Sequence, residues 1–457
     1  MHYDRRRFLQ KSIGAALGGA TLLGPLGNLS LINAAIGATP AFNDYKALVC
    51  VFLIGGNDGF NTVVPSDSYH SAYAQQRGPL AIAASNLIAL NPVAGGMPSD
   101  GHTYGLHSSM PEMAALFNTG KAAVIANVGT LLRPITRAEY QSGLYVPPQL
   151  FAHNDQQNMW QTSRPDDSAA NGWGGRVADL LHAANPPSVP MTMSIAQQFP
   201  FLRGDTINQY VTDSGGLTQL SYTVTPNART ALFNTLHQPN APTNILQRAY
   251  AGTLDHTINT YNTIASVLPA PGTYAGFTNS NDGGFGMQME TVARLINASS
   301  AKLGMHRQIF FIGVGGYDTH NAQLTGQAAL LANLSQNINA LFASMGQMNL
   351  ADQVTIFTAS DFGRTLSVNS DGTDHGWGGH HFVVGGAVQG QRFYGTMPSL
   401  AATAQNNDDV GWGQIIPTTS VDQYAAPLAS WFGVDNAGIA TIFPNLGHFA
   451  GPLAFMA

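Results

Sequence analysis

The chain has 457 residues, of which 44% are hydrophobic, so it can bury a large core in two or three domains or in one α/β domain with insertions. Its net charge is −6 and no basic patch stands out, which argues against nucleic acid as a partner. The 50 glycines and 25 prolines indicate many turns, and abundant Asn, Gln, Ser and Thr indicate the polar, weakly charged surface common in secreted proteins.

The N-terminus resembles a twin-arginine export signal, with Arg5-Arg6 as the pair. A weakly hydrophobic run follows, and small residues at 35–38 are a candidate cleavage site. The alternative is an amphipathic helix or a membrane anchor, but the Gly, Asn and Pro content of the run makes a stable membrane span doubtful. We therefore expect residues 1–37 to be a signal peptide that the twin-arginine machinery reads. The mature protein is then expected in the periplasm or outside the cell.

The apolar run at residues 47–54 predicts the first buried strand, and the polar loop GGNDGFNT follows it directly. Glycines beside Asp58 let the backbone turn tightly and approach a ligand. Thr62 is interpreted either as a nucleophile that touches a metal or as a turn or capping hydroxyl. Asn61 is a candidate for binding a substrate oxygen.

An amphipathic pattern near residues 110–120 predicts a helix, and the run at 122–128 predicts a second buried strand. The later segment FAHNDQQNMWQT is too polar for a core segment and too aromatic for a plain linker. We interpret it as the wall of a pocket, in which His153, Asn154 and Asp155 bind substrate.

Helical patterns recur near residues 175–184 and 245–268. Between them, residues 186–243 are rich in Pro, Thr, Asn and Gln, with short alternating stretches. This composition predicts an insertion or cap over the main domain.

A third strand is predicted at 308–314, and GGYDTH follows it. Asp318 and His320 stand two positions apart, so in extended backbone their side chains leave the same face and can share a metal. The alternative is an Asp that caps the next helix, predicted near 325–345, with an exposed His beside it.

A fourth strand is predicted at 353–358, and Asp361 follows it in ASDFGRT. Arg364 in the same loop could hold an anionic oxygen through two hydrogen bonds, or it could form a salt bridge to a nearby Asp. The next loop, before the fifth strand at 381–388, is rich in glycine and histidine.

In that loop His375 is the preferred metal ligand and His380 the second choice. Asp374 is interpreted either as a ligand or as a group that orients His375. A mixture of carboxylate and imidazole ligands suits Zn, Mn or Fe better than Mg or Ca.

Apolar runs that alternate with amphipathic helices predict a doubly wound, mostly parallel α/β sheet with helices on both faces, over residues 43–457. In such a sheet the carboxyl ends of the strands form one ligand-binding edge. Asp58, Asp318 and Asp361 each follow a buried strand and are expected to meet there. Gathered carboxylates repel one another, and one or two divalent cations would remove that repulsion.

The motifs GGNDGFNTVVP, HNDQQNMWQT, GGYDTH, SDFGRT and GTDHGWGGHH together resemble a secreted bacterial family known as the domain of unknown function numbered 1501. That family is similar in turn to the alkaline phosphatase and sulfatase superfamily, as a remote branch. The resemblance covers nearly the whole mature chain. It implies a doubly wound α/β fold, a two-metal edge and cleavage of small anionic phosphate or sulfate esters.

The resemblance implies that Asp58, Asp318, His320, Asp361 and His375 correspond to metal ligands of the superfamily. Three departures stand out: one residue instead of three separates the Asp from the His after the third strand, Phe stands where a His is expected after Asp361, and HNDQQ offers no Ser, Thr or Cys nucleophile.

The first hypothesis is therefore a secreted metal-dependent hydrolase of phosphate or sulfate esters. The alternative is a catalytically degenerate protein of the same fold that binds a ligand or acts in surface assembly. A redox protein ranks last, because the sequence has no GxGxxG after a first strand, no cysteine cluster and no haem motif.

Overall fold

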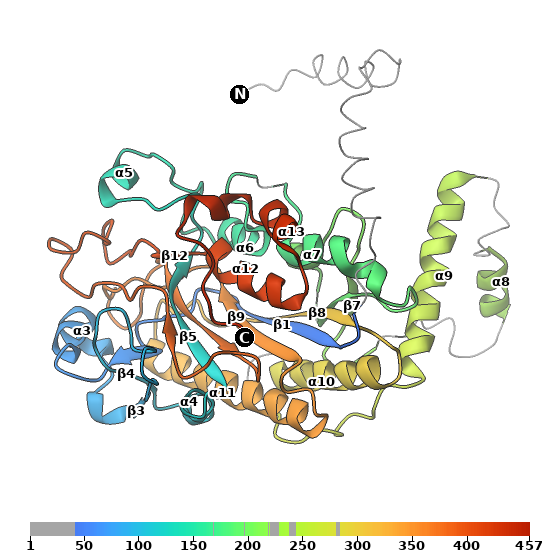
Figure 1. Cartoon of the computed structure of the whole chain (residues 1–457), viewed down its shortest axis with the longest axis horizontal. Helices are drawn as coiled ribbons and strands as arrows, with labels where there is room; N and C mark the ends of the chain where they lie inside the picture. The colour runs from blue at the N-terminus through green and yellow to red at the C-terminus, as the bar shows by residue number, and fades with distance from the viewer. Residues whose placement is uncertain are drawn as a thin grey trace, which may run out of the picture. The chain divides into compact units, whose positions relative to one another are not determined.

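The computed structural model describes residues 42–167, 169–195, 197–217, 219, 228–236, 244–279 and 284–457. Residues 1–37, the predicted export signal, lie outside the described part of the chain. Residues 42–457 form one compact unit, in which helices cover a central sheet (Figure 1).

The elements alternate along the chain in the predicted manner. The strands are β1 (Lys46–Leu53), β2 (Val63–Pro65), β3 (Leu87–Ala89), β4 (Tyr104–His107), β5 (Ala122–Gly129), β6 (Thr192–Ile195), β7 (Tyr210–Thr212), β8 (Arg307–Val314), β9 (Val354–Ser360), β10 (Gly379–Val384), β11 (Phe393–Tyr394) and β12 (Thr419–Ser420). The α-helices are α3 (His70–Arg77), α4 (Pro111–Asn118), α5 (Arg137–Gln141), α6 (His153–Thr162), α7 (Trp173–Leu181), α8 (Ala228–Leu236), α9 (Ile245–Ala265), α10 (Phe285–Ala301), α11 (Gln323–Gln347), α12 (Val421–Phe432) and α13 (Asn436–Ile442).

The main sheet has the strand order β11-β5-β10-β9-β1-β8-β6-β7, and β12 also pairs with β5. β1 lies between β8 and β9 and is parallel to both. β10 is antiparallel to both of its neighbours, β5 and β9. The predicted α/β fold with a mostly parallel sheet is therefore confirmed, with β10 as the reversed strand.

The two faces of β1 belong to two different layers of the core. Val49 and Val51 pack in one apolar cluster with residues of α4, α10 and α11. Cys50 and Phe52 pack in another cluster with residues of α6, α7, α12 and α13. Successive strand residues point to opposite faces, so helices on both sides require a strand that is apolar throughout. This is why the predicted strand reads as a continuous apolar run.

A smaller sheet of β2, β4 and β3 lies outside the main one. Of the predicted insertion at 186–243, β6 pairs with β8 and β7 pairs with β6, so these two strands extend one edge of the main sheet. The insertion itself stays a prediction, and part of it lies outside the described residues.

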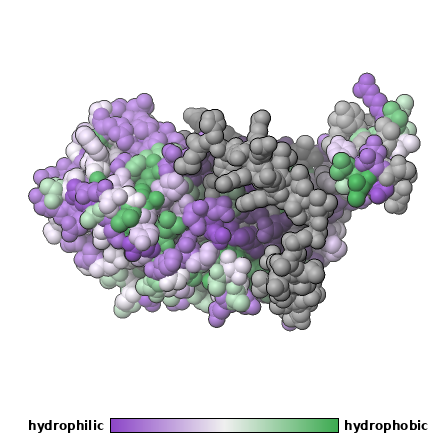
Figure 2. Space-filling view, turned by 90° about the horizontal axis from the view of Figure 1, so that it is seen from above, coloured by the Kyte–Doolittle hydropathy of each residue, from purple (hydrophilic) through white to green (hydrophobic). Residues whose placement is uncertain are grey.

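Hydrophilic residues cover much of the face seen from above, and hydrophobic residues lie among them in small groups (Figure 2). Within the ranges that the structure describes, no helix combines the length and apolar character needed to span a membrane.

Candidate metal centre

Several candidate residues lie at one edge of the main sheet. Asp318 and His320 are in the loop after β8, Asp361 directly follows β9, and His153 begins α6 in the segment after β5. His375 precedes β10, and because β10 is reversed, its first residue lies at this same edge. The strand order therefore brings together residues that are far apart in sequence.

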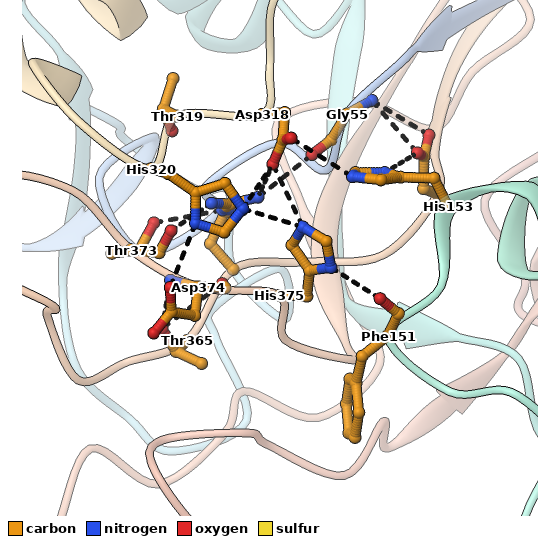
Figure 3. A network of polar contacts seen from close by, with 12 residues as sticks. Gly55, Phe151, His153, Asp318, Thr319, His320, Thr365, Thr373, Asp374 and His375 are labelled. Carbon is orange, nitrogen blue, oxygen red and sulfur yellow. Dashed lines mark hydrogen bonds and ion pairs between the residues drawn. The ribbon is translucent and has the colours of Figure 1, made fainter.

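Three imidazole rings surround the carboxylate of Asp318 (Figure 3). Its Oδ1 lies 3.0 Å from Nε2 of His320 and 3.2 Å from Nε2 of His375. Its Oδ2 lies 3.4 Å from Nε2 of His153. Donor atoms of His153, Asp318 and His375 all lie within 4.8 Å of one another.

Each of the three rings has its other nitrogen bound by an acceptor. Nδ1 of His153 lies 2.7 Å from Oδ2 of Asp361, and Nδ1 of His320 lies 3.1 Å from Oδ1 of Asp374.

In the third ring, Nδ1 of His375 lies 2.6 Å from the carbonyl oxygen of Phe151. Carboxylate and carbonyl oxygens only accept, so Nδ1 carries the hydrogen in all three rings. In the neutral form each Nε2 then offers a lone pair, which is how metal-binding histidines are usually oriented.

The donor set fits a divalent transition-metal ion such as zinc. Nε2 of His320 and Nε2 of His375 are 3.0 Å apart, and two lone pairs at that distance repel each other unless a cation or a proton lies between them. Tetrahedral ligands at about 2.0–2.1 Å from zinc lie roughly 3.3 Å from one another. The separations of 3.0–3.4 Å between the Asp318 oxygens and the three Nε2 atoms are close to that spacing. His320 lies outside the group of His153, Asp318 and His375, whose donor atoms are all within 4.8 Å of one another.

Local electrostatics keep Asp318 ionised. Burial acts to raise its pKa, but the hydrogen bond and charge of Arg364 outweigh this effect, so the pKa is lowered. The hydrogen bond to Asp361 raises the pKa of His153, whereas burial lowers the pKa of His375.

Arg364 is buried and engaged on all sides. Nη1 donates to Oδ1 of Asp318 at 2.6 Å and to the Gly55 carbonyl at 3.3 Å, and Nε donates to Oγ1 of Thr373 at 3.2 Å. Nη2 donates to the Thr373 carbonyl. The salt-bridge interpretation of Arg364 therefore describes its contacts, and its guanidinium is buried. Its part in catalysis stays a prediction.

Asp361 and Asp374, predicted as metal ligands, lie behind the imidazoles. Asp361 is buried and also accepts hydrogen bonds from the Gly55 amide at 3.2 Å and from Nε2 of Gln157 at 3.0 Å. Asp374 also accepts from Nδ2 of Asn369 at 2.9 Å. We propose that both carboxylates orient histidines, and that Asp374 orients His320 instead of His375.

Phe362 occupies the position where the resemblance leads one to expect a histidine. Its ring centroid lies 5.0 Å from that of His153 and 4.7 Å from that of His375, so it packs against both imidazoles. A side chain at Gly56, whose φ is +89°, would place its Cβ 2.6 Å from the Phe362 ring. Glycine after β1 is therefore needed for close packing against this apolar support.

Asp58 lies apart from this group, and its role as a metal ligand stays a prediction. Among the described residues, the donor group whose atoms all lie within 4.8 Å is His153, Asp318 and His375, and it includes none of Asp58, His320 and His380. Arg77 of α3, buried like Asp58, donates through Nη2 to Oδ2 of Asp58, and Gln323 donates to the same oxygen. The Arg77 guanidinium therefore balances the charge of the Asp58 carboxylate.

His380, the second-choice ligand, also lies apart from this group, and its role stays a prediction. It is buried, and its Nδ1 accepts from the Asn127 amide at 3.1 Å. Burial lowers the pKa of His380 to about 4 and that of its neighbour His381 to about 3.

Asn61 and Thr62 are both fully buried. The Thr62 hydroxyl donates to the Asp58 carbonyl at 2.6 Å, which is the contact expected of a turn hydroxyl. Asn61 Nδ2 donates to the Leu80 carbonyl at 2.9 Å, and its Oδ1 accepts from Tyr73 at 2.7 Å. Both side chains thus hold the loop after β1.

Asn154 and Asp155 lie in the first turn of α6, directly after His153. Asn154 is exposed and Asp155 is half-buried. Substrate binding by these two residues stays a proposal.

His153 is predicted to bind substrate, and in the structure it is one of the candidate metal donors. In the sequence, His153 is visible only as a histidine at the start of a polar segment. That pattern alone does not indicate that its ring lies beside Asp318. The Phe151 carbonyl that orients His375 is backbone and leaves no mark in the sequence.

Replacing Asp361 by asparagine is expected to weaken metal binding about 10–100-fold, the usual cost of losing an orienting partner. The reason is that Nδ1 of His153 loses its carboxylate acceptor. Competition with a chromogenic chelator measures the affinity. Asp155→Asn, on the helix that carries His153, is the matched control and should bind metal like the wild type. Equal metal affinities for Asp361→Asn and Asp155→Asn would contradict the role of Asp361.

The buried pair His380 and His381 predicts a loss of stability in acid. The fold lowers the pKa of both imidazoles. As the pH falls below about 6.5, His380 and His381 therefore take up protons in the unfolded chain but stay uncharged in the folded protein. The free energy of unfolding should drop by about 2–4 kcal/mol between pH 7 and pH 5. Urea titrations at the two pH values measure it. His381→Gln should show a clearly smaller drop, and an undiminished drop would rule out this origin.

Comparison with protein families gives one match. A family described as "Protein of unknown function (DUF1501)" matches residues 45–418. No curated protein matches the chain.

Similar solved structures are distant. The lipoteichoic acid synthase LtaP from Listeria monocytogenes has 8% identity and a TM-score of 0.35, with 85% of this chain and 80% of that chain covered. The PsFucS1 sulfatase from Pseudoalteromonas sp. has 12% identity and a TM-score of 0.33, with 90% and 75% covered. The C-terminal periplasmic domain of EcEptC from Escherichia coli, in complex with Zn, has 12% identity and a TM-score of 0.30, with 76% and 74% covered. Similarity at this level bears on neither the substrate nor the metal of this chain.

Proposed function

The chain belongs to the DUF1501 family, and we propose that it is a metal-dependent hydrolase of phosphate or sulfate esters that acts outside the cytoplasm. The observation that carries the proposal is the convergence of three Nε2 atoms, from His153, His320 and His375, on the carboxylate of Asp318. Every ring also has an acceptor at Nδ1. Such an arrangement favours transition-metal binding over a plain cluster of surface charges.

The chain's own groups have defined parts in this proposal. His153, His320, His375 and Asp318 would hold the ion, which when bound supplies Lewis-acid polarisation of an ester oxygen and lowers the pKa of a water. Arg364 keeps Asp318 ionised and in place. The side chain of Phe362 excludes water from one side of the imidazoles.

Metal analysis of the purified protein, followed by assays with phosphomonoesters, phosphodiesters and sulfate esters, tests the proposal. We expect close to one equivalent of zinc, manganese or iron, turnover of at least one ester class, and loss of turnover on chelation. His256→Ala, an exposed histidine on α9, is the control and should keep metal and activity. No metal and no turnover would remove the proposal.

A second candidate function is ligand binding or surface assembly without catalysis. The contacts of Thr62 and Arg364, the two predicted catalytic residues, favour this function. Both side chains form hydrogen bonds within the loops at the sheet edge. In that case, combined alanine substitutions at Asp361 and His375 would leave the phenotype of the producing strain intact.

We also propose that residues 1–37 direct export through the twin-arginine pathway. Lysine substitution of both Arg5 and Arg6 should then retain the protein in the cytoplasm. Cell fractionation measures this, and unchanged export would contradict it.

A further inference from the structure

Two loops flank His375. One contacts its imidazole ring and the other contacts its backbone carbonyl. Phe151, at the end of the loop 131–151, accepts from His375 Nδ1 at 2.6 Å. Gln414, in the loop 403–416, donates through Nε2 to the His375 carbonyl at 3.1 Å. Both loops therefore lie beside the candidate metal centre.

The same two loops are held to each other. Arg137 donates through Nη1 to the Thr403 carbonyl at 2.9 Å. Apolar residues of both loops also share one cluster, built on Leu131, Trp377 and Ile416. The loops thus form one continuous wall next to the centre.

Trp412 stands out on this wall because its indole is 84% exposed, the largest exposed fraction among the exposed large hydrophobic residues described. Its φ of +59° lies in the left-handed region, which is unfavourable for a bulky residue. Both the exposed ring and the backbone conformation cost free energy. Such features usually persist where a function requires them. On the other loop Tyr145 is also exposed, and the Arg133 guanidinium lies 3.7 Å from its ring centroid.

The backbone around Trp412 is firmly anchored. Asp409 Oδ1 accepts from the amides of Gly411 at 2.8 Å and Gly413 at 3.1 Å, and its Oδ2 accepts from Oγ1 of Thr403 at 2.6 Å. A Cβ on Gly413 would lie 2.3 Å from the Ser367 amide, so the loop packs closely against its neighbour. These contacts fix the backbone that carries Trp412, whose indole is almost fully exposed.

The loop that carries Trp412 exposes neutral amides at Gln405 and Asn407. The segment whose Leu366 amide donates to the Gly413 carbonyl exposes Asn369 and Ser370, and also the carboxylate of Asp371. The arginines of loop 131–151 are engaged, Arg133 with Glu139 and Arg137 with backbone carbonyls. A lone ring on a wall that exposes amides and a hydroxyl suits a sugar, whose ring has an apolar C–H face and hydroxyls at its rim. It suits an anionic membrane poorly, because the described residues of these two loops include no cluster of free cations.

We propose that Trp412 forms a carbohydrate subsite beside the metal centre, by stacking against the apolar face of a glycosyl ring. The proposal deepens the proposed function by making a glycan the alcohol part of the ester, and the stacking itself needs no metal. Trp412 is then a positioning residue that contributes to substrate affinity.

Binding of the purified protein to an array of neutral, sulfated and phosphorylated oligosaccharides tests this proposal, with calorimetry on the strongest glycan in the presence of zinc and of a chelator. We expect Trp412→Ala to weaken binding about tenfold or more in both conditions, as for a truncated aromatic anchor. Trp412→Phe should retain most of the affinity. The melting temperature of each variant should match the wild type, since the side chain is exposed. Tyr250→Ala, another exposed aromatic residue on α9, is the matched control.

No binding of any glycan, or equal binding by Trp412→Ala, would overturn the proposal. Binding to phosphatidylglycerol vesicles that depends on Trp412, without glycan binding, would overturn it in favour of a membrane surface. Glycan binding that depends on Trp412 in a protein without metal or turnover would support the subsite and remove only the hydrolase.

Discussion

Replacing His375 by alanine is expected to abolish metal retention and any metal-dependent ester hydrolysis. His375 supplies an Nε2 that lies 3.0 Å from Nε2 of His320 and 3.2 Å from Oδ1 of Asp318, so its loss opens the donor set. Metal affinity should fall by more than the roughly 10–100-fold that an orienting partner contributes.

The increase in unfolding temperature on adding zinc measures this effect without relying on activity. A ligand that binds only the folded state at about 100 times its Kd stabilises it by about 2.7 kcal/mol. The wild type should show that increase, and His375→Ala should show none. His256→Ala, an exposed histidine of α9, should behave like the wild type. A full zinc-dependent increase in His375→Ala would exclude this residue as a ligand.

The second large effect is expected at the buried pair Arg77 and Asp58. Replacing Arg77 by methionine leaves the Asp58 carboxylate buried without its cation, which typically costs about 3–5 kcal/mol of stability. Arg77 also donates to the Thr365 carbonyl at 2.9 Å, directly beside Arg364. The loop that carries Arg364 and His375 should therefore loosen as well.

Urea unfolding measures the loss, and a double-mutant cycle identifies its origin. The double variant Asp58→Asn with Arg77→Met should lose much less than the sum of the single variants, because no charge is left unpaired. Arg133→Met removes the partner of Glu139 in a partly exposed pair and should cost no more than about 1 kcal/mol. Additive losses at Asp58 and Arg77 would contradict the pairing.

The sequence was sufficient to predict the buried strands and the edge at which Asp318, His320 and His375 meet. Strands covered on both faces read as unbroken apolar runs, and the ends of parallel strands share one edge. These rules are local or depend only on the fold class, so they need no knowledge of individual contacts.

Asp58 shows where the same rules fail. GGND after β1 and GGYD after β8 look equivalent in the sequence. In the structure, however, Asp58 pairs with a guanidinium, whereas Asp318 lies among imidazoles. The difference comes from Arg77 on α3, whose direction depends on packing that no local pattern reveals. The position of His153 beside Asp318 was not predicted for a similar reason, because it depends on how α6 lies against the loop after β8.

The position of β1 in the sheet has a consequence for biosynthesis. Lys46 pairs with Arg307, and Ala47 pairs with Val354, so both partners of this central strand leave the ribosome long after it does. Until then, an eight-residue strand with seven apolar residues has neither of its sheet neighbours. Such long-range pairing slows folding and exposes aggregation-prone segments. The nascent chain should therefore depend on chaperones until β8 and β9 have been made.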